Sequence, residues 1–149
     1  MAPLVYAGGA MSLNDLQLLD KLANLDIKSH NIVKNFNKSE RHVLSAEIRQ
    51  TLSTIHHLVI RAAKVQLKEK RRAAAPGSTL KLLEDADVEI EYLKHQIRKA
   101  NALGQVDDQR YGEWVRDVRV VGGLCGGWIK SLQAAREKPT PKATPQSLL

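Results

Sequence analysis

The chain has 149 residues, 43% of them hydrophobic and 26% charged, which fits one globular domain and leaves little room for a second. It carries 23 Lys and Arg residues against 16 Asp and Glu, a formal net charge of +7, so an anionic partner such as a nucleic acid is the first expectation. The single cysteine excludes an internal disulfide framework and fits a reducing, cytoplasmic location, and no apolar run approaches the roughly 20 residues of a membrane-spanning helix.

Helical spacing begins near the start of the chain. From Leu18 onward, apolar residues recur at intervals of three and four, which predicts a helix over 12–36. The preceding residues, 1–11, lack this pattern, and we expect a flexible extension there. Asn37 and Glu40 then have the form of a capping box, in which the Asn side chain caps a new helix and the glutamate reaches back to the Asn backbone N–H.

The second predicted helix is long, covering 38–73, because its apolar stripe is followed by good helix formers without a break. Pro76 and Gly77 end it, since proline disfavours a helical conformation in the residue before it and glycine favours a turn. Ser78 is expected to cap the third helix, predicted over 79–102.

The fourth helix is predicted over 108–135, after a stop signal at Gly104. Three prolines follow in 137–149, where too few apolar residues remain to fold, so we expect a disordered tail. The folded domain is expected to span 12–136. Four amphipathic helices with short connections predict an all-α, up-down-up-down antiparallel four-helix bundle.

The sequence contains no convergent set of catalytic groups, and we expect no enzyme activity, no metal site and no cofactor. Cys125 lies on the inner stripe of the fourth helix, where a free cysteine behaves as a small apolar residue. His56 and His57 are adjacent, so they point about 100° apart on a helix and cannot share a ligand. The carboxylates from Glu84 to Glu91 suit the start of a helix, where the dipole favours negative charge.

Basic residues are better organised, and we predict that they bind nucleic acid. On the second helix they recur at spacings of three and four and form one positive edge, which consists of Arg61, Lys64, Lys68 and Arg71, with Arg72 beside it. Later helices add Lys94, Arg98, Arg116 and Arg119. Such residues can follow a phosphate backbone with salt-dependent affinity and weak sequence specificity. The alternative is a solvated charged face.

The segment from Gly122 to Trp128 is unusual, because four glycines inside a helix cost about 1 kcal/mol each relative to alanine. They form two interleaved pairs, Gly122 with Gly126 and Gly123 with Gly127, which leave two bare strips along the helix. One strip can serve the bundle core and the other can seat a second subunit, with the Trp128 ring as an interface anchor. The alternative is a close helix crossing inside one monomer.

Three motifs resemble a known family. F-N-K-S-E-R at 36–41 looks like the F-P-K-S-E-R signature of accessory variability determinant (Avd) proteins, which belong to diversity-generating retroelements. In that family the signature lies at the junction of helices 1 and 2. Related proteins encoded in intervening sequences of ribosomal RNA genes share it. Y-L-K at 92–94 with I-R at 97–98 is similar to the family's L-R-x-x-x-R, and G-G-W-I-K-S-L at 126–132 to its closing motif. The likeness covers about 12–133.

The resemblance implies a barrel-shaped homopentamer that binds a reverse transcriptase and its template-repeat RNA. It would support mutagenic cDNA synthesis and retrohoming while the polymerase performs the chemistry. From the basic stripes themselves we expect binding of DNA as well. Arg41, Lys94 and Arg98 match basic positions of the family motifs. Two residues depart from the pattern: Asn37 replaces the usual proline, and Lys94 stands where arginine is common, which weakens any case for bidentate phosphate recognition there.

Two alternatives to this function follow from the same pattern. One is a structural four-helix-bundle scaffold whose basic faces are only solvated. The other is a homologue from a ribosomal RNA intervening sequence, which has no polymerase partner.

Overall fold

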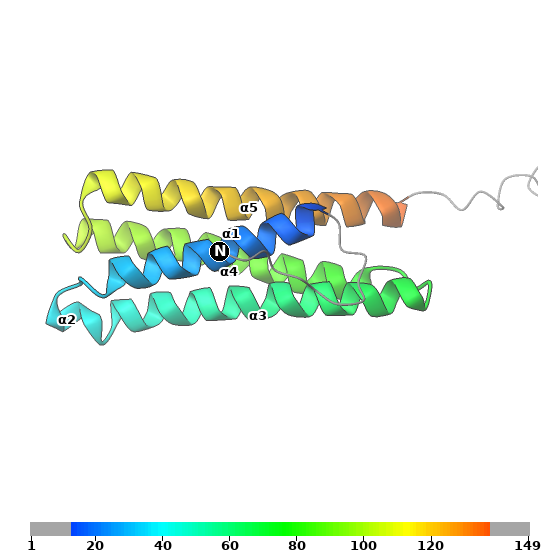
Figure 1. Cartoon of the computed structure of the whole chain (residues 1–149), viewed down its shortest axis with the longest axis horizontal. Helices are drawn as coiled ribbons and strands as arrows, with labels where there is room; N and C mark the ends of the chain where they lie inside the picture. Colours follow the sequence, from blue (N-terminus) through cyan, green and yellow to red (C-terminus); the bar gives the residue numbers. More distant parts are fainter. Residues whose placement is uncertain (1–12, 138–149) are drawn as a thin grey trace, which may run out of the picture.

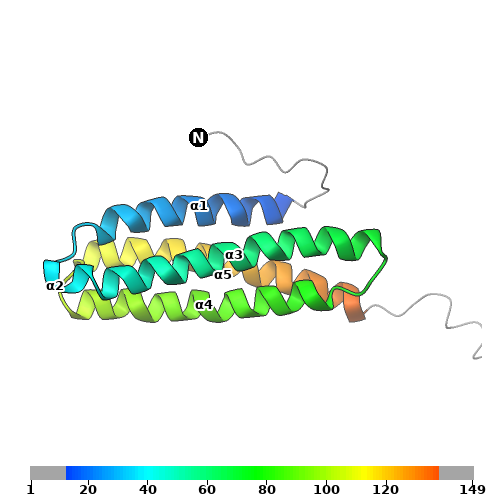
Figure 2. The same cartoon turned by 90° about the horizontal axis from the view of Figure 1, so that it is seen from below.

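The computed structural model describes residues 13–137, and the regular secondary structure of these residues is entirely helical. Four long helices run side by side, with one short helix at an end of the bundle (Figure 1). In chain order the helices are α1 (Leu13–Val33), α2 (Lys38–Arg41), α3 (Leu44–Arg71), α4 (Gly77–Ala102) and α5 (Asp108–Glu137). Consecutive long helices run in opposite directions (Figures 1 and 2), so the predicted all-α four-helix bundle is confirmed.

The long helices form a closed ring of neighbours. α1 packs against α3 and α5, and α4 packs against the same two helices from the opposite corner. Burial of the predicted apolar stripes drives this arrangement. The centre of the core is formed by Leu18, Leu22 and Leu25 of α1, Ile48, Leu52, Ile55 and Val59 of α3, Leu83, Ile90, Leu93 and Ile97 of α4, and Trp114, Val118, Val121 and Cys125 of α5.

A buried polar pair accounts for Ser29, a polar residue within the apolar seam of α1. Ser29 and Trp114 are each 0% exposed, and the indole Nε1 of Trp114 donates a hydrogen bond to the Ser29 hydroxyl at 2.8 Å. Trp114 is among the largest fully buried side chains of the described residues. The polar position on α1 is therefore the acceptor that a buried indole requires.

The predicted continuous helix over 38–73 is wrong, because the chain forms α2, turns at His42 and Val43, and only then begins α3. No residue of α2 is buried, so apolar packing gives this short helix no reason to extend. Phe36 and Leu44 are each 1% exposed, and the segment between them crosses the end of the bundle (Figure 1).

The predicted capping box is also wrong. Asn37 is the N-cap of α2, but its side chain makes no capping hydrogen bond. The Asn37 backbone N–H donates to Oε1 of Gln105 at 2.8 Å, where Glu40 was expected as the acceptor. Gln105 lies in the turn between α4 and α5, so this bond ties together the two turns at one end of the bundle.

At the other end, α4 is capped from α3. The expectation that Ser78 caps this helix is wrong, because α4 begins at Gly77 and Ser78 lies within it. One carboxylate oxygen of Glu69 accepts hydrogen bonds from the backbone N–H groups of Ser78 and Thr79, each at 3.1 Å. A carboxylate placed there also complements the positive end of the α4 dipole.

The predicted end of the third helix is confirmed. α4 ends at Ala102, and Gly104 follows with φ +72°, a left-handed conformation that glycine adopts without strain. None of the described helices is long and apolar enough to cross a membrane. The extension expected at 1–11 lies outside the described residues, as does the expected tail beyond residue 137.

Candidate nucleic-acid interface

The basic edge predicted on the second helix lies on the surface along the C-terminal half of α3. Its members are all exposed, and none makes a side-chain hydrogen bond or ion pair with another residue of the described chain: Arg61, Lys64, Lys68, Arg71 and the C-cap residue Arg72. We call these five residues the α3 edge. Glu69 is the one acidic residue in the segment 61–72, and its carboxylate caps α4. The positive charge of the α3 edge is therefore uncompensated within this part of the chain.

A second basic cluster forms where α4 and α5 meet. Lys94 and Arg98 of α4 share one hollow with Arg119 of α5. Lys94 Nζ donates to Glu91 Oε2 at 3.0 Å, and this hydrogen bond lowers the pKa of the glutamate. Arg98 and Arg119 are exposed and have no such carboxylate partner in residues 13–137. We call this group the α4–α5 cluster.

The predicted basic residues thus fall into separate groups. The α3 edge lies near the α3–α4 turn, whereas the α4–α5 cluster lies nearer the α4–α5 turn at the opposite end of the bundle (Figure 1). Arg116 is exposed on α5, one turn before Val120. Arg41 has a structural contact, because its Nε donates to the Phe36 backbone carbonyl at 3.0 Å and so closes the junction between α1 and α2.

The glycine-rich segment of α5 does not meet a neighbouring helix closely. A Cβ atom added at Gly123, Gly126 or Gly127 would have no neighbour within 4 Å, and one added at Gly122 would make only an ordinary contact of 3.5 Å with Ile90 Cγ2. The alternative of a close helix crossing inside one monomer is therefore wrong. The strip of Gly123 and Gly127 is exposed to solvent.

Trp128 lies inside the bundle, which corrects the expectation of an exposed interface anchor. The residue is 4% exposed, and its indole Nε1 donates to Oε1 of the buried Gln66 at 2.7 Å. Its ring therefore packs α5 against α3 and leaves little surface for a partner. Gln66 supplies the acceptor that a buried indole N–H requires, and this permits the inward orientation.

The expected inertness of Cys125 agrees with its surroundings. The residue is 0% exposed, and its Sγ donates a weak hydrogen bond to the Leu83 carbonyl at 3.6 Å. Burial raises the pKa of the thiol to about 12, so the nucleophilic thiolate is suppressed. Over residues 13–137, no group of three or more His, Cys, Asp or Glu side chains could hold a metal ion.

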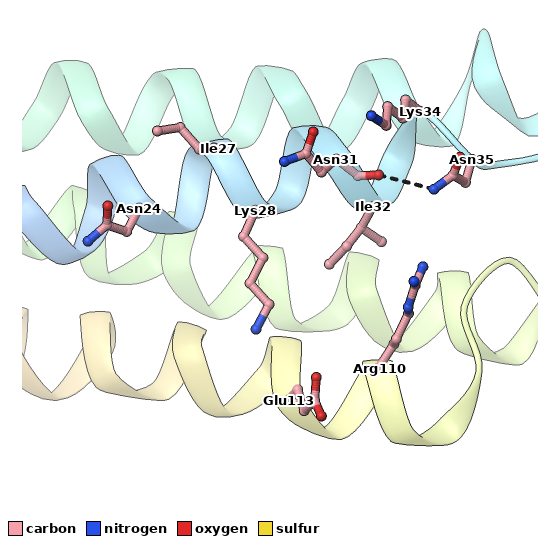
Figure 3. A pocket seen from close by; sticks show the side chains of 9 residues that line it. All are labelled: Asn24, Ile27, Lys28, Asn31, Ile32, Lys34, Asn35, Arg110 and Glu113. Carbon is pink, nitrogen blue, oxygen red and sulfur yellow. Dashed lines mark hydrogen bonds between the residues drawn. The ribbon is translucent and has the colours of Figure 1, made fainter. Parts of the chain in front are cut away.

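A groove between α1 and α5 is the feature that the sequence did not reveal. Figure 3 shows its walls, with side chains of α1 on one side and those of α5 on the other. It has a volume of about 550 Å³ and is lined by Asn24, Ile27, Lys28, Asn31, Ile32, Lys34, Asn35, Arg110 and Glu113. On α1, the spacing of Asn24 and Asn31 with the exposed Ile27 places them on one face, which was a signal available in the sequence, and Asn35 follows in the turn after the helix. Their place opposite Arg110 across the groove depends on tertiary packing.

Comparison with known proteins gives one family. The model of a protein family described as bAvd-like matches residues 16–132, a range that runs from the first turn of α1 nearly to the end of α5. No curated protein matches the chain.

Proposed function

Because the chain belongs to the bAvd-like family, the Avd-type proteins of diversity-generating retroelements, we propose that it is a non-catalytic accessory subunit of the element's reverse transcriptase. It binds the polymerase and the template-repeat RNA, and also DNA, through basic surfaces. In this role it supports mutagenic cDNA synthesis and retrohoming in the cytoplasm, while the polymerase makes and breaks the bonds.

The observation that carries this proposal is the uncompensated charge of the α3 edge. Its cations repeat at helical spacing on one exposed face and make no ion pair within the described residues. Each contact with a phosphate releases a counterion, so binding weakens as salt is added. The segment 61–72 contains no aromatic residue, so base stacking contributes nothing there. Contacts with the phosphate backbone of the nucleic acid therefore dominate binding.

The proposal includes assembly into a homopentamer, which the family resemblance implies. The exposed strip of Gly123 and Gly127 supports a subunit contact, because bare backbone lets another helix approach closely. Gly122 and Gly126, which are only partly exposed, border this strip. In an assembly, each copy contributes one α3 edge, and modest contacts add through multivalency.

The test compares two variants that lose the same charge. In the first, Arg61, Lys64, Lys68 and Arg71 are all changed to Gln. In the control, four exposed cations that lie outside the proposed surfaces are changed to Gln: Lys21, Lys34, Lys38 and Arg49. Affinity for a single-stranded RNA is measured between about 50 mM and about 300 mM salt, where each lost phosphate contact should flatten the logarithmic salt dependence by roughly 0.7.

We expect the α3-edge variant to bind RNA far more weakly and with a flatter salt dependence, while the control stays close to the unmodified chain. Equal losses in both variants would mean that only total charge matters. No loss in either would show that the α3 edge is merely solvated and would favour a structural scaffold. Copurification with the retroelement polymerase tests the second partner, and its failure would favour the intervening-sequence alternative.

A further inference from the structure

The outward face of α4 carries an apolar ridge that no part of the described chain covers. Val88 is 66% exposed and Tyr92 is 50% exposed, and they lie one helical turn apart. Ile90 and Leu93, on the other side of α4, are buried. Large apolar side chains gathered at one surface position are a mark of an interaction site.

Carboxylates surround this ridge, although the chain as a whole is basic. They are Glu84, Asp85, Asp87, Glu89 and Glu91, and no cation lies between Glu84 and Glu91 in the sequence. Asp85 is paired with Lys81 at 2.7 Å, and Glu91 with Lys94 at 3.0 Å. The other three have no ion pair in the described part of the chain. We call the ridge and these carboxylates the α4 face.

The outward side of α5 has the opposite character. Gly123 and Gly127 are exposed, with nothing within 4 Å of an added Cβ, so bare backbone forms a shallow trough. Val120, 44% exposed, gives this trough an apolar end. Its rim is basic, because three exposed cations without a carboxylate partner in residues 13–137 flank it: Arg116, Arg119 and Lys130. We call this region the α5 face.

The two faces match in spacing as well as in charge. Val88 and Tyr92 are separated by four residues, as are Gly123 and Gly127, so both intervals rise about 6 Å along a helix. A ridge of side chains four residues apart fits a groove with the same interval, which is the commonest way in which helices pack in globular proteins. Acidic residues of the α4 face would then lie opposite basic residues of the α5 face.

We propose that the α4 face of one copy of this chain docks on the α5 face of a second copy, with Val88 and Tyr92 seated over Gly123 and Gly127. The inference deepens the proposed assembly and rests on it, since it names the surface that fills the glycine strip. Charge complementarity selects a second copy, because a single chain carries both halves of the contact.

Such a contact is head-to-tail, because each copy offers different faces to its two neighbours. α4 and α5 occupy adjacent corners of the bundle (Figure 2), so every contact rotates the next copy relative to the last. A head-to-tail contact that rotates successive copies closes into a ring when the rotation divides a full turn. A self-complementary contact would instead stop at a dimer.

The test uses two variants that each destroy one face. Val88→Lys with Tyr92→Lys places like charge against the basic rim, and Gly123→Leu with Gly127→Leu fills the trough. Leucine favours a helix over glycine, and the open space around both glycines leaves the fold undisturbed. The matched controls are Ile27→Lys, at an exposed apolar position on α1, and Gly112→Leu, at an exposed glycine of α5 with nothing within 4 Å.

Native mass is measured for each variant alone and for an equimolar mixture. We expect each variant alone to be a monomer, the mixture to form dimers that grow no further, and the controls to keep the mass of the unmodified chain. The dimer is the decisive result, because one variant retains a working α5 face and the other a working α4 face. A mixture that stays monomeric overturns the inference.

The same measurements separate this inference from the proposed function. If both variants assemble like the unmodified chain, the inference is overturned while the proposed oligomer stands. If the unmodified chain is itself a monomer, the proposed pentamer and this contact both fail. RNA binding by the α3 edge is measured on the same samples, and we expect the monomeric variants to retain it with reduced avidity.

Discussion

Removing the Ser29 hydroxyl should destabilise the bundle by more than a typical surface change. In Ser29→Ala, the indole N–H of Trp114 loses its acceptor at 2.8 Å, and both residues are 0% exposed, so water cannot replace it without opening the core. An unpaired buried donor costs about 1–3 kcal/mol. For a domain of this size, each kcal/mol corresponds to about 2–4 °C in Tm, so we expect a Tm lower by roughly 2–12 °C.

Thermal unfolding gives the Tm and urea unfolding gives the free energy, both followed by circular dichroism, with Ser53→Ala as the control because Ser53 is exposed on α3. A double-mutant cycle with Trp114→Phe isolates the hydrogen bond from the change in packing. Once the indole N–H is gone, Ser29→Ala should cost much less, since no donor is left unpaired. If Ser29→Ala lowers the unfolding free energy by less than about 0.5 kcal/mol in the unmodified background, the reasoning about this buried pair is refuted.

Two further predictions concern the turn between α3 and α4 and the contact between α1 and α3. Glu69→Ala should lower the free energy of unfolding by about 0.5–2 kcal/mol, because the backbone N–H groups of Ser78 and Thr79 lose their shared acceptor. Glu69→Gln should retain most of this stability, because its amide oxygen can accept the same hydrogen bonds. Equal losses in the two variants would contradict the capping role. Burial lowers the pKa of His56 from 6.5, against the opposing effect of Asp26, whose Oδ2 lies 3.9 Å from Nδ1. Below pH 6.5 the unfolded chain therefore binds more protons, so stability should fall on acidification, and His56→Gln should reduce the fall measured between about pH 7.5 and about pH 5.5. An unchanged fall in that variant would assign the effect to other groups.

The candidate site was predictable only in part. The α3 edge followed from spacing within one helix, because residues three and four apart on a helix always share a face. The grouping of Arg98 with Arg119 did not follow, since it depends on how α4 packs against α5. The inward orientation of Trp128 was likewise hidden, because its partner Gln66 belongs to a different helix.

By itself, the sequence determined the number of long helices and most of their inner faces, because a regular apolar interval acts locally and needs no knowledge of distant residues. Their alternating directions followed from the short connections between them. The inward positions of Trp114 and Trp128 did not follow from the interval. Tertiary structure alone decided where α2 breaks from α3, that Glu69 caps α4, and that Gln105 takes the hydrogen bond expected of Glu40. The break follows from the absence of buried residues in α2, and the other two features depend on a donor and an acceptor brought together by packing. A linear pattern records which polar groups need partners, and only the assembled bundle determines which partners they find.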